Sequence, residues 1–384
     1  MPRAKHPEKT VLVLQGGGAL GSYQGGAFEA LVEHDHQPDW VAGISIGAIN
    51  AALIAGNPPE RRVERVRTFW ETVTATTKAT PFQSFMHRDS YNDVSAAATM
   101  LMGIPGFFKL RTPPAAMMPK GTVGASSFYD TAPLRETLLE LVDFDYLNNG
   151  PVRLSVGAVN VETGNMTWFD SKIHVILPEH IMASGALPPA FPAIKIDGAY
   201  YWDGGLVSNT PLQYILDEQM PGDDLVIFQI DVFSARGVMP ASVWQIEARE
   251  KDIRFSSRTR FNTDMMRRLH NTNEAARRLY AKLPPELRDD PDAKALLVGH
   301  AVPSVAIVHL IYKQPAYEDQ NKDFEFSRSS MEDHWDAGVK DVLETCTNSE
   351  WTGRDHSHKR VQVFDLTHPK IKINLRGKTG GKAE

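Results

Sequence analysis

The amino-acid sequence predicts an α/β fold of three layers, in which helices cover both faces of a mostly parallel central sheet. The first observation is a short, continuous apolar run at Thr10–Gln15, which is typical of a strand buried on both faces. The second is the alternation of strand-like and helix-like stretches from this run to Gly56. An order of strand, helix, strand, helix predicts a parallel sheet with right-handed crossovers.

The elements of this first unit follow in order. A helix is predicted from Gly21 to Glu33, with alanine and leucine on one face. Trp40–Gly43 is a second short strand, and Ile46–Ala55 is an apolar helix. The helix ends before Gly56-Asn-Pro-Pro59, because glycine and proline terminate helices.

Residues 76–128 interrupt this rhythm. They are rich in Thr, Ser, Pro and Met, and regular α/β connections are much shorter, so we expect an inserted cap or lid. The segment Met100–Met118 contains clustered methionine and phenylalanine. Its composition is equally consistent with a lid that opens at a lipid surface and with ordinary core filling of a small cap.

The remaining sequence continues the core and then adds an extension. We predict a core at 8–240 that includes the cap, an extension at 241–352, and a basic tail at 353–384 that is frayed. The extension should pack on the core through a late buried strand at 303–312. Other predicted elements are helices at 132–142, 331–343 and within 241–282, strands at 152–159, 166–169, 199–202 and 225–232, and a short apolar run at 173–177.

Composition excludes several classes of protein. The 384 residues carry a formal net charge of −6, which argues against general nucleic-acid binding and against broad electrostatic docking on anionic membranes. A single cysteine, Cys346, excludes an intrachain disulfide and fits a reducing compartment. No run fits a signal peptide or a transmembrane span, so a cytoplasmic protein is expected, with any contact to membranes or lipid inclusions local and apolar.

Gly43-Ile-Ser45-Ile-Gly47 is a G-x-S-x-G sequence between a predicted strand and a predicted helix. Such a sharp turn can expose a serine hydroxyl, the flanking glycines avoid clashes, and the helix N-terminus stabilises negative charge. The pattern alone also fits a simple tight turn. Its position between strand and helix favours a nucleophile elbow.

A glycine-rich turn, Gly16-Gly17-Gly18, follows the first strand and leads into a helix. Unpaired N–H groups in such a turn can bind a phosphate or an oxyanion. With Gly21 the spacing also matches a dinucleotide fingerprint, but that fold needs an acidic residue after the next strand, and this strand leads to Ser45. A purely structural turn is the remaining alternative.

Asp203-Gly204-Gly205 follows an aromatic strand. A carboxylate at a strand end, beside glycines that permit close approach, can reach a nucleophile on a neighbouring strand. Taken alone, the sequence equally fits a β-turn. Asp197-Gly198 is a second such candidate and competes for the same role.

In combination, these three features resemble the patatin-like phospholipase family over roughly residues 10–215. The resemblance includes the segment Ala183–Pro192 and the Asn209-Thr-Pro211 sequence after the Asp motif. It implies a serine lipid acyl hydrolase with a Ser45–Asp203 dyad and no catalytic histidine, metal or cofactor. It further implies an oxyanion hole at Gly16, Gly17 and Gly18, with a lipid or other ester as the substrate.

One position departs from the family pattern. The family usually carries Arg or Lys before the last glycine of the turn, where this chain has Leu20. The departure keeps ester hydrolysis but leaves phospholipid preference open, with neutral lipid esters and polyhydroxyalkanoates as alternatives. A catalytically silent lipid-binding regulator is the alternative from another class, and a nucleotide-binding protein comes third. The sequence leaves the oligomeric state open.

A Ser-His-Asp hydrolase is the nearest competing mechanism, because His300, His309 and His334 all follow the Asp motif. His309 lies inside an apolar strand and is expected in the core, whereas His300 and His334 are expected on the surface or in loops. Only one helix and one strand separate Gly18 from Ser45, too few for the α/β-hydrolase fold. The dyad is therefore preferred.

Overall fold

The computed structural model describes residues 8–75, 95–96, 99–218, 224–256, 268, 272, 275–295, 304–315, 321–354 and 361–366. Within these residues lies a nine-stranded mixed sheet with the strand order β11-β10-β9-β1-β2-β5-β8-β7, and with β6 paired to β5. The strands from β11 to β5 are parallel, whereas β6, β7 and β8 run antiparallel to their partners. The predicted α/β fold with a mostly parallel central sheet is confirmed.

The central strands are buried on both faces, as their continuous apolar sequences predict. In β1 (Lys9–Leu14), Leu12 and Leu14 contribute to the larger hydrophobic cluster, while Val11 and Val13 contribute to a second cluster on the other face. The larger cluster includes α1 (Ser22–Glu33), α2 (Ile46–Ala55) and α3 (Pro59–Val73). The second cluster includes α8 (Leu212–Glu218), so helices cover both faces of the sheet and form three layers.

The first βαβα unit agrees with the sequence prediction to within a residue or two. β2 spans Trp40–Gly43 and pairs in parallel with β1, so that Gly43 lies opposite Leu14. Because both strands end at the same edge of the sheet, the glycine turn after β1 and the elbow after β2 lie side by side.

The antiparallel part of the sheet begins at β5 (Arg153–Asn160). β6 (Met166–Asp170) and the hairpin of β7 (Ile194–Ile196) and β8 (Ala199–Asp203) complete it. The apolar run 173–177 forms no strand, and Ile173, Val175 and Leu177 are exposed. Helices α5 (Ala132–Leu141), α6 (Phe144–Asn149) and α7 (Pro178–Ser184) connect these strands.

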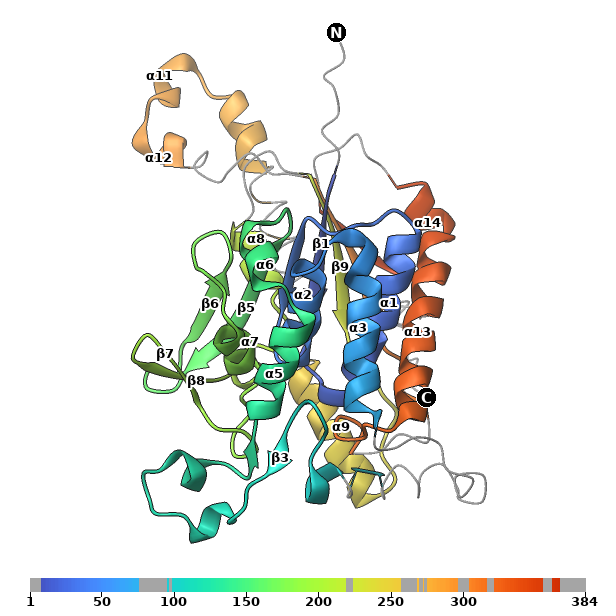
Figure 1. The fold of residues 1–384 in the computed structure, drawn as a ribbon. Coiled ribbons are helices and arrows are strands. Elements are labelled where there is room, and N and C mark those ends of the chain that lie inside the picture. Colours follow the sequence, from blue (N-terminus) through green and yellow to red (C-terminus); the bar gives the residue numbers. More distant parts are fainter. Residues whose placement is uncertain are drawn as a thin grey trace, which may run out of the picture.

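The described part of the predicted insertion, which we call the cap, contributes no strand to the central sheet, and residues 76–94 and 97–98 lie outside the described residues. The cap contains β3 (Lys109–Leu110), which pairs with β4 (Tyr129–Asp130), and the short 3-10 turns Ala115–Met117 and Val123–Ser126. In Figure 1 the strand β3 and the helix α9 (Val243–Phe255) occupy the same, lower end of the molecule, whereas α11 (Pro285–Arg288) and α12 (Pro291–Ala295) lie at the upper end.

The C-terminal extension joins the core through a strand and a helix. β10 (Val305–Ile311) pairs in parallel with β9 (Leu225–Asp231). α13 (Arg328–Cys346) lies along α1 in Figure 1, and a Cβ added at Gly26 would approach the backbone oxygen of Trp335 to 1.9 Å. Glycine on α1 therefore permits this close crossing of the two helices. α14 (Ser349–Thr352) follows, with Trp351 in the core.

The predicted frayed tail is wrong for one segment. Val361–Asp365 forms β11, which pairs in parallel with β10 at the edge of the sheet. Its alternating sequence, Val-Gln-Val-Phe, is typical of a half-buried strand, but the surrounding basic residues obscured this signal.

Among the described residues, every helix is too short or too polar to span a lipid bilayer.

Candidate active site

Ser45 lies at a strained bend between β2 and α2. Its backbone angles are φ 56° and ψ −122°, and a positive φ is unfavourable for any residue with a Cβ. Ser45 is partly exposed, although its neighbours from Val41 to Asn50 are buried. The bend therefore exposes part of the serine, while the residues on either side of it are buried.

The glycines on either side of Ser45 are required by close contacts. A Cβ at Gly43 would lie 2.2 Å from the carbonyl oxygen of Gly47. A Cβ at Gly47 would lie 2.4 Å from the carbonyl oxygen of Leu14 in β1. Because both contacts are with backbone atoms, neither can be relieved by a side-chain rotation. The spacing of G-x-S-x-G thus follows from packing of the bend against the neighbouring strand.

The sheet topology carries Asp203 to the same place. β2 and β6 both pair with residues 155–156 of β5, so they lie on opposite sides of that strand. β6 and β8 both pair with residues 158–159 of β5, so they also lie on opposite sides of it. β2 and β8 therefore lie on the same side of β5 and approach each other end to end. β2 ends at Gly43 opposite Val156, and β8 ends at Asp203 opposite Ala158.

The two side chains meet in this gap. The hydroxyl of Ser45 donates a hydrogen bond to the carboxylate of Asp203, and the N–H of Gly205 donates a second one, 2.7 Å in length. Asp203 is only 3% exposed. Burial raises its pKa to about 6, while the bonds from Ser45 and Gly205 act in the opposite direction. A carboxylate in this setting is a stronger base than an exposed one, yet still ionised at neutral pH.

The glycine turn adjoins this pair. A Cβ at Gly16 would lie 2.4 Å from Oδ1 of Asn209 and 3.1 Å from the Cβ of Ser45, so glycine permits this close approach. The N–H of Gly16 donates to the carbonyl of Asn209 at 3.2 Å. The N–H groups of Gly17 and Gly18 have no hydrogen-bond acceptor among the described residues, and both glycines are partly exposed. Two backbone donors are thus available beside the serine, but that of Gly16 is not.

A further free donor lies on the elbow itself. The N–H of Ile46, at the start of α2, also has no acceptor within the described part of the chain. The residue after a nucleophile commonly supplies an oxyanion donor in elbow sites. Its position at a helix N-terminus adds a favourable partial positive charge. Sequence reasoning did not single out Ile46, although it follows directly from the assignment of the elbow.

Ser184 at the end of α7 supports the bend from behind. Its hydroxyl accepts a hydrogen bond from the N–H of Ser45 at 3.0 Å and donates one to the carbonyl of Gly157 at 2.6 Å. Asn209 has a similar role at the glycine turn, because its side-chain amide donates to the carbonyl of Gly16 at 2.9 Å. Both residues lie in sequence segments that the resemblance highlighted, but the sequence did not indicate what they contact.

Comparison with known families resolves which kind of protein carries this arrangement. Residues 12–216, more than half of the chain, match the model of the patatin-like phospholipases, and residues 253–358 match a second model described as patatin phospholipase. The chain belongs to the patatin-like phospholipase family. The predicted resemblance is confirmed, and the matched region contains Ser45, Asp203 and the glycine turn.

Individual relatives share less with this chain. A patatin-like phospholipase domain-containing protein of Caenorhabditis elegans, M110.7, is 44% identical over 59 residues, which is 15% of this chain and 5% of the relative. Among solved structures, VipD from Legionella pneumophila is 13% identical, with a TM-score of 0.32 over 88% of this chain and 67% of VipD. ExoU, solved in complex with SpcU from Pseudomonas aeruginosa, is 15% identical, with a TM-score of 0.29 over 65% of this chain and 47% of that chain.

Leu20 occupies the position at which family members usually carry a cation. Its side chain is fully buried in the larger hydrophobic cluster. This family member therefore gains a core contact there and has no positive charge from that position at its glycine turn.

The competing carboxylate, Asp197, lies at the opposite end of β8. Asp197 (φ 49°) and Gly198 (φ 91°) form the two-residue turn between β7 and β8, and both are exposed. Positive φ at both positions is typical of a type I′ hairpin turn. Asp197 therefore has a turn-forming role and does not approach Ser45.

The histidines do not join the Ser45–Asp203 pair within the described residues. His309 is buried in β10, as predicted, whereas His300 lies outside the described residues. The prediction of a surface position for His334 is wrong: it is 2% exposed on α13, and its Nδ1 lies 3.3 Å from the hydroxyl of Ser22. Its neighbours Trp335 and Met331 place this helix face in the core.

No group of three or more His, Cys, Asp or Glu side chains with a metal-binding arrangement occurs among the residues that the structure describes.

Proposed function

We propose that this chain is a serine acyl hydrolase that cleaves carboxylic esters of lipids with a Ser45–Asp203 dyad. The observation that carries the proposal is the hydrogen bond from the Ser45 hydroxyl to a buried carboxylate whose pKa is about 6. Nucleophile, base and unpaired backbone donors are the three parts that acyl transfer requires. Membership in the patatin-like phospholipase family supports lipid esters as the substrate class.

In the proposed reaction, Asp203 accepts the hydroxyl proton as Ser45 Oγ attacks the ester carbonyl carbon. The carbonyl oxygen becomes an oxyanion, which the N–H groups of Gly17 and Gly18, together with that of Ile46, can stabilise. Protonated Asp203 then gives its proton to the departing alcohol, which leaves an acyl group on Ser45. Attack by a water, deprotonated by Asp203, releases the carboxylic acid and restores the serine.

Exposed apolar side chains on the cap support contact with a lipid surface. Leu101, Met102, Met117, Val123 and Phe128 are each more than half exposed. Hydrogen bonds connect the cap to the segment after α7. The N–H groups of Phe128 and Tyr129 donate to the carbonyls of Pro189 and Ala190, respectively. We propose that this cap surface contacts the aggregated substrate, because the transfer of exposed apolar side chains from water into an apolar phase is favourable.

The proposed substrate class extends beyond the phospholipids that the family name suggests. Leu20 offers no charge for an anionic head group, which favours neutral lipid esters or hydroxyalkanoate polyesters alongside phospholipids. A panel of phospholipid, triacylglycerol, short acyl esters and polyhydroxybutyrate distinguishes these substrates, provided that Ser45→Ala is measured in parallel.

The decisive experiment removes each member of the dyad. We expect Ser45→Ala and Asp203→Ala to abolish hydrolysis of an activated acyl ester, because each removes a group that forms or breaks a bond. Replacement of His309 or His334 should leave Ser45-dependent turnover in the folded protein. In the wild type, kcat/KM should rise as pH increases through about 6, where Asp203 becomes the ionised base.

Two results would contradict the proposal. A histidine variant that folds yet is as inactive as Ser45→Ala would exclude the dyad. Lipid binding without turnover, with Ser45 unlabelled by a fluorophosphonate, would instead favour a catalytically silent lipid-binding regulator.

A further inference from the structure

We propose that the C-terminal extension positions the oxyanion donors of the active site through a crossed pair of ion pairs on α9. This inference rests on the proposed function, since it concerns the same site. It gives residues 241–352 a role in catalysis as well as in folding.

The glycine turn is held at both ends, and by different parts of the chain. At its start, Gly16 exchanges hydrogen bonds with Asn209, which belongs to the core. Just after its end, the N–H of Ala19 donates to the carbonyl of Asp323 at 2.9 Å. The two unpaired N–H groups, those of Gly17 and Gly18, lie between these anchors. Their direction therefore depends on a backbone atom of the extension.

The contact at Asp323 is tight enough to control the turn. A Cβ at Gly18 would lie 2.2 Å from the carbonyl oxygen of Asp323, and Gly18 has a φ of +55°. The residue thus adopts a conformation that glycine alone accepts readily, directly against the extension. A shift of Asp323 would either release Gly18 or push it.

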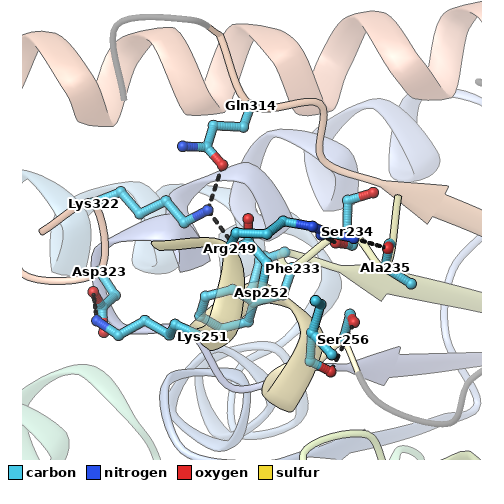
Figure 2. A network of polar contacts seen from close by, with 12 residues as sticks. Phe233, Ser234, Ala235, Arg249, Lys251, Asp252, Ser256, Gln314, Lys322 and Asp323 are labelled. Atoms are coloured by element: carbon cyan, nitrogen blue, oxygen red, sulfur yellow. Dashed lines mark hydrogen bonds and ion pairs between the residues drawn. The ribbon is translucent and has the colours of Figure 1, made fainter. Parts of the chain in front are cut away.

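Two ion pairs hold Asp323 and its neighbour Lys322 in place. Lys251 Nζ lies 2.6 Å from a carboxylate oxygen of Asp323, and Lys322 Nζ lies 2.6 Å from one of Asp252. Consecutive residues of α9 thus pair with consecutive residues of the 321–325 segment, each Lys with the opposite Asp. Figure 2 shows these side chains together, with Gln314 as a second partner of Lys322. We call this arrangement the clasp.

The clasp is mostly buried, and α9 is itself held by hydrogen bonds to the preceding loop. Lys322 is 3% exposed and Asp252 11%, whereas Lys251 and Asp323 are 25% and 14% exposed. Buried ion pairs with short contacts define one geometry more strictly than exposed pairs do. On α9 itself, Arg249 donates to the carbonyls of Ser234 and Ala235 in the preceding loop (Figure 2).

The end of α9 also reaches the core side of the site. The carbonyl of Phe255 accepts hydrogen bonds from the side-chain amides of Gln15 at 3.1 Å and Asn209 at 3.5 Å. Gln15 directly precedes the glycine turn, and Asn209 anchors its first residue. The same helix therefore touches both anchors: Asn209 through Phe255, and Asp323 through Lys251.

These contacts make Lys251 and Asp323 positioning residues. Neither has to touch the substrate, because they act on the direction of two N–H groups. Hydrogen bonds to a developing oxyanion depend steeply on placement, so a small displacement of the turn should lower kcat more than it changes KM.

The test reverses each charge and then restores the pair. Lys251→Asp places a second negative charge beside Asp323, and Asp323→Lys places a second positive charge beside Lys251. The double variant restores an ion pair with the two charges exchanged. We expect kcat of each single variant to fall about tenfold or more. This loss should be smaller than the ~10²–10³-fold loss that follows deletion of an oxyanion donor. KM should stay near the wild-type value, and the double variant should recover most of the rate.

A second readout separates positioning from stability. Thiocarbonyl sulfur accepts hydrogen bonds poorly, so the rate ratio of an ester to its thionoester analogue reports on the oxyanion donors. We expect this ratio to fall in the single variants and to recover in the double variant. Should Lys251→Asp not fold, Lys251→Met removes the same pair without a like-charge contact and should shift the ratio in the same direction.

The matched control lies on the same helix. Arg254 and Glu250 form an exposed ion pair on α9, and its reversal should leave both kcat and the ratio unchanged. The inference would be overturned if the single clasp variants kept the wild-type kcat and the wild-type ester-to-thionoester ratio. It would also be overturned if they lost activity only through unfolding, with this ratio unchanged. Either result would leave the proposed function intact. A wild type without Ser45-dependent turnover would overturn the proposed function as well.

Discussion

Asp203 combines two environments that oppose each other. Burial disfavours its charge, whereas Ser45 and Gly205 donate hydrogen bonds to it. The net effect raises the pKa of the carboxyl to about 6, well above the ordinary value of 3.8 for aspartate. The folded state therefore binds a proton more tightly than the unfolded chain does, and ionisation of Asp203 destabilises the fold.

This opposition predicts a pH-dependent gain of stability in Asp203→Asn. Below pH 3.8 both states of the wild type are protonated at this carboxyl, so its ionisation has no effect; as pH rises through 6, the full penalty develops and persists. Two pKa units correspond to about 3 kcal/mol. The free energy of unfolding of the variant, relative to the wild type, should therefore increase by about this amount between pH 4 and pH 8.

Chemical denaturation of both proteins across this pH range measures the effect, and all other titrating groups cancel in the comparison. A difference that stays constant with pH would show that the carboxyl is not destabilised by burial.

At the scale of elements, the site is formed by strand ends that meet. β2 and β8 run toward each other along one edge of β5, with Gly157 opposite the gap between them. A Cβ at Gly204 would lie 2.5 Å from the carbonyl oxygen of Gly157, so the second strand arrives as close as a glycine permits. α7 then fixes the gap through Ser184, which bonds both Ser45 and Gly157.

Ser184→Ala tests this connection between elements. The change leaves the partly buried N–H of Ser45 without its acceptor, and loss of the partner of a buried polar group typically costs about 1–3 kcal/mol. We expect lower stability in this range and a fall in kcat of about tenfold, because the elbow loses its support. Thermal unfolding and steady-state kinetics measure the two effects.

Ser126→Ala is the matched control, since that hydroxyl bonds only a nearby carbonyl in the exposed cap. An equal effect in both variants, or none in Ser184→Ala, would argue against the supporting role of α7.

For the whole molecule, the contacts join core and extension in a continuous sheet. β9 is flanked by β1 on one side and β10 on the other, and Ile227 and Phe228 are completely buried. Trp335 of α13 packs against Gly25 and Gly26 of α1. The core defined by the first family model is therefore covered by residues that follow it in the chain.

Truncation after residue 240 should consequently abolish folding. β9 would become an open edge, and the apolar face of α1 would lose its cover, both of which favour aggregation. We expect an insoluble or unfolded product, measured by solubility and circular dichroism. A chain that ends after residue 366 keeps every described element and should fold; a soluble, folded product ending at 240 would contradict the prediction.

The sequence by itself determined the local elements and the type of site. Continuous apolar runs and glycine breaks located β1, β2 and α2, because buried parallel strands and elbow turns leave strong local signals. Ser45, the glycine turn and an Asp-Gly candidate were evident from motif and order. Local sequence could not distinguish Asp203 from Asp197, since both precede glycine beside the same strand.

Only the tertiary structure decided which of these residues meet. The choice of Asp203 depends on the pairing of β2 and β8 along one edge of β5, which is a long-range property. The burial of His334, the edge strand at 361–365 and the contact of Asp323 with Ala19 likewise depend on packing between distant segments. Sequence patterns report the local period and the turns of a chain, whereas the partners of a strand or a side chain are set when the whole sheet assembles.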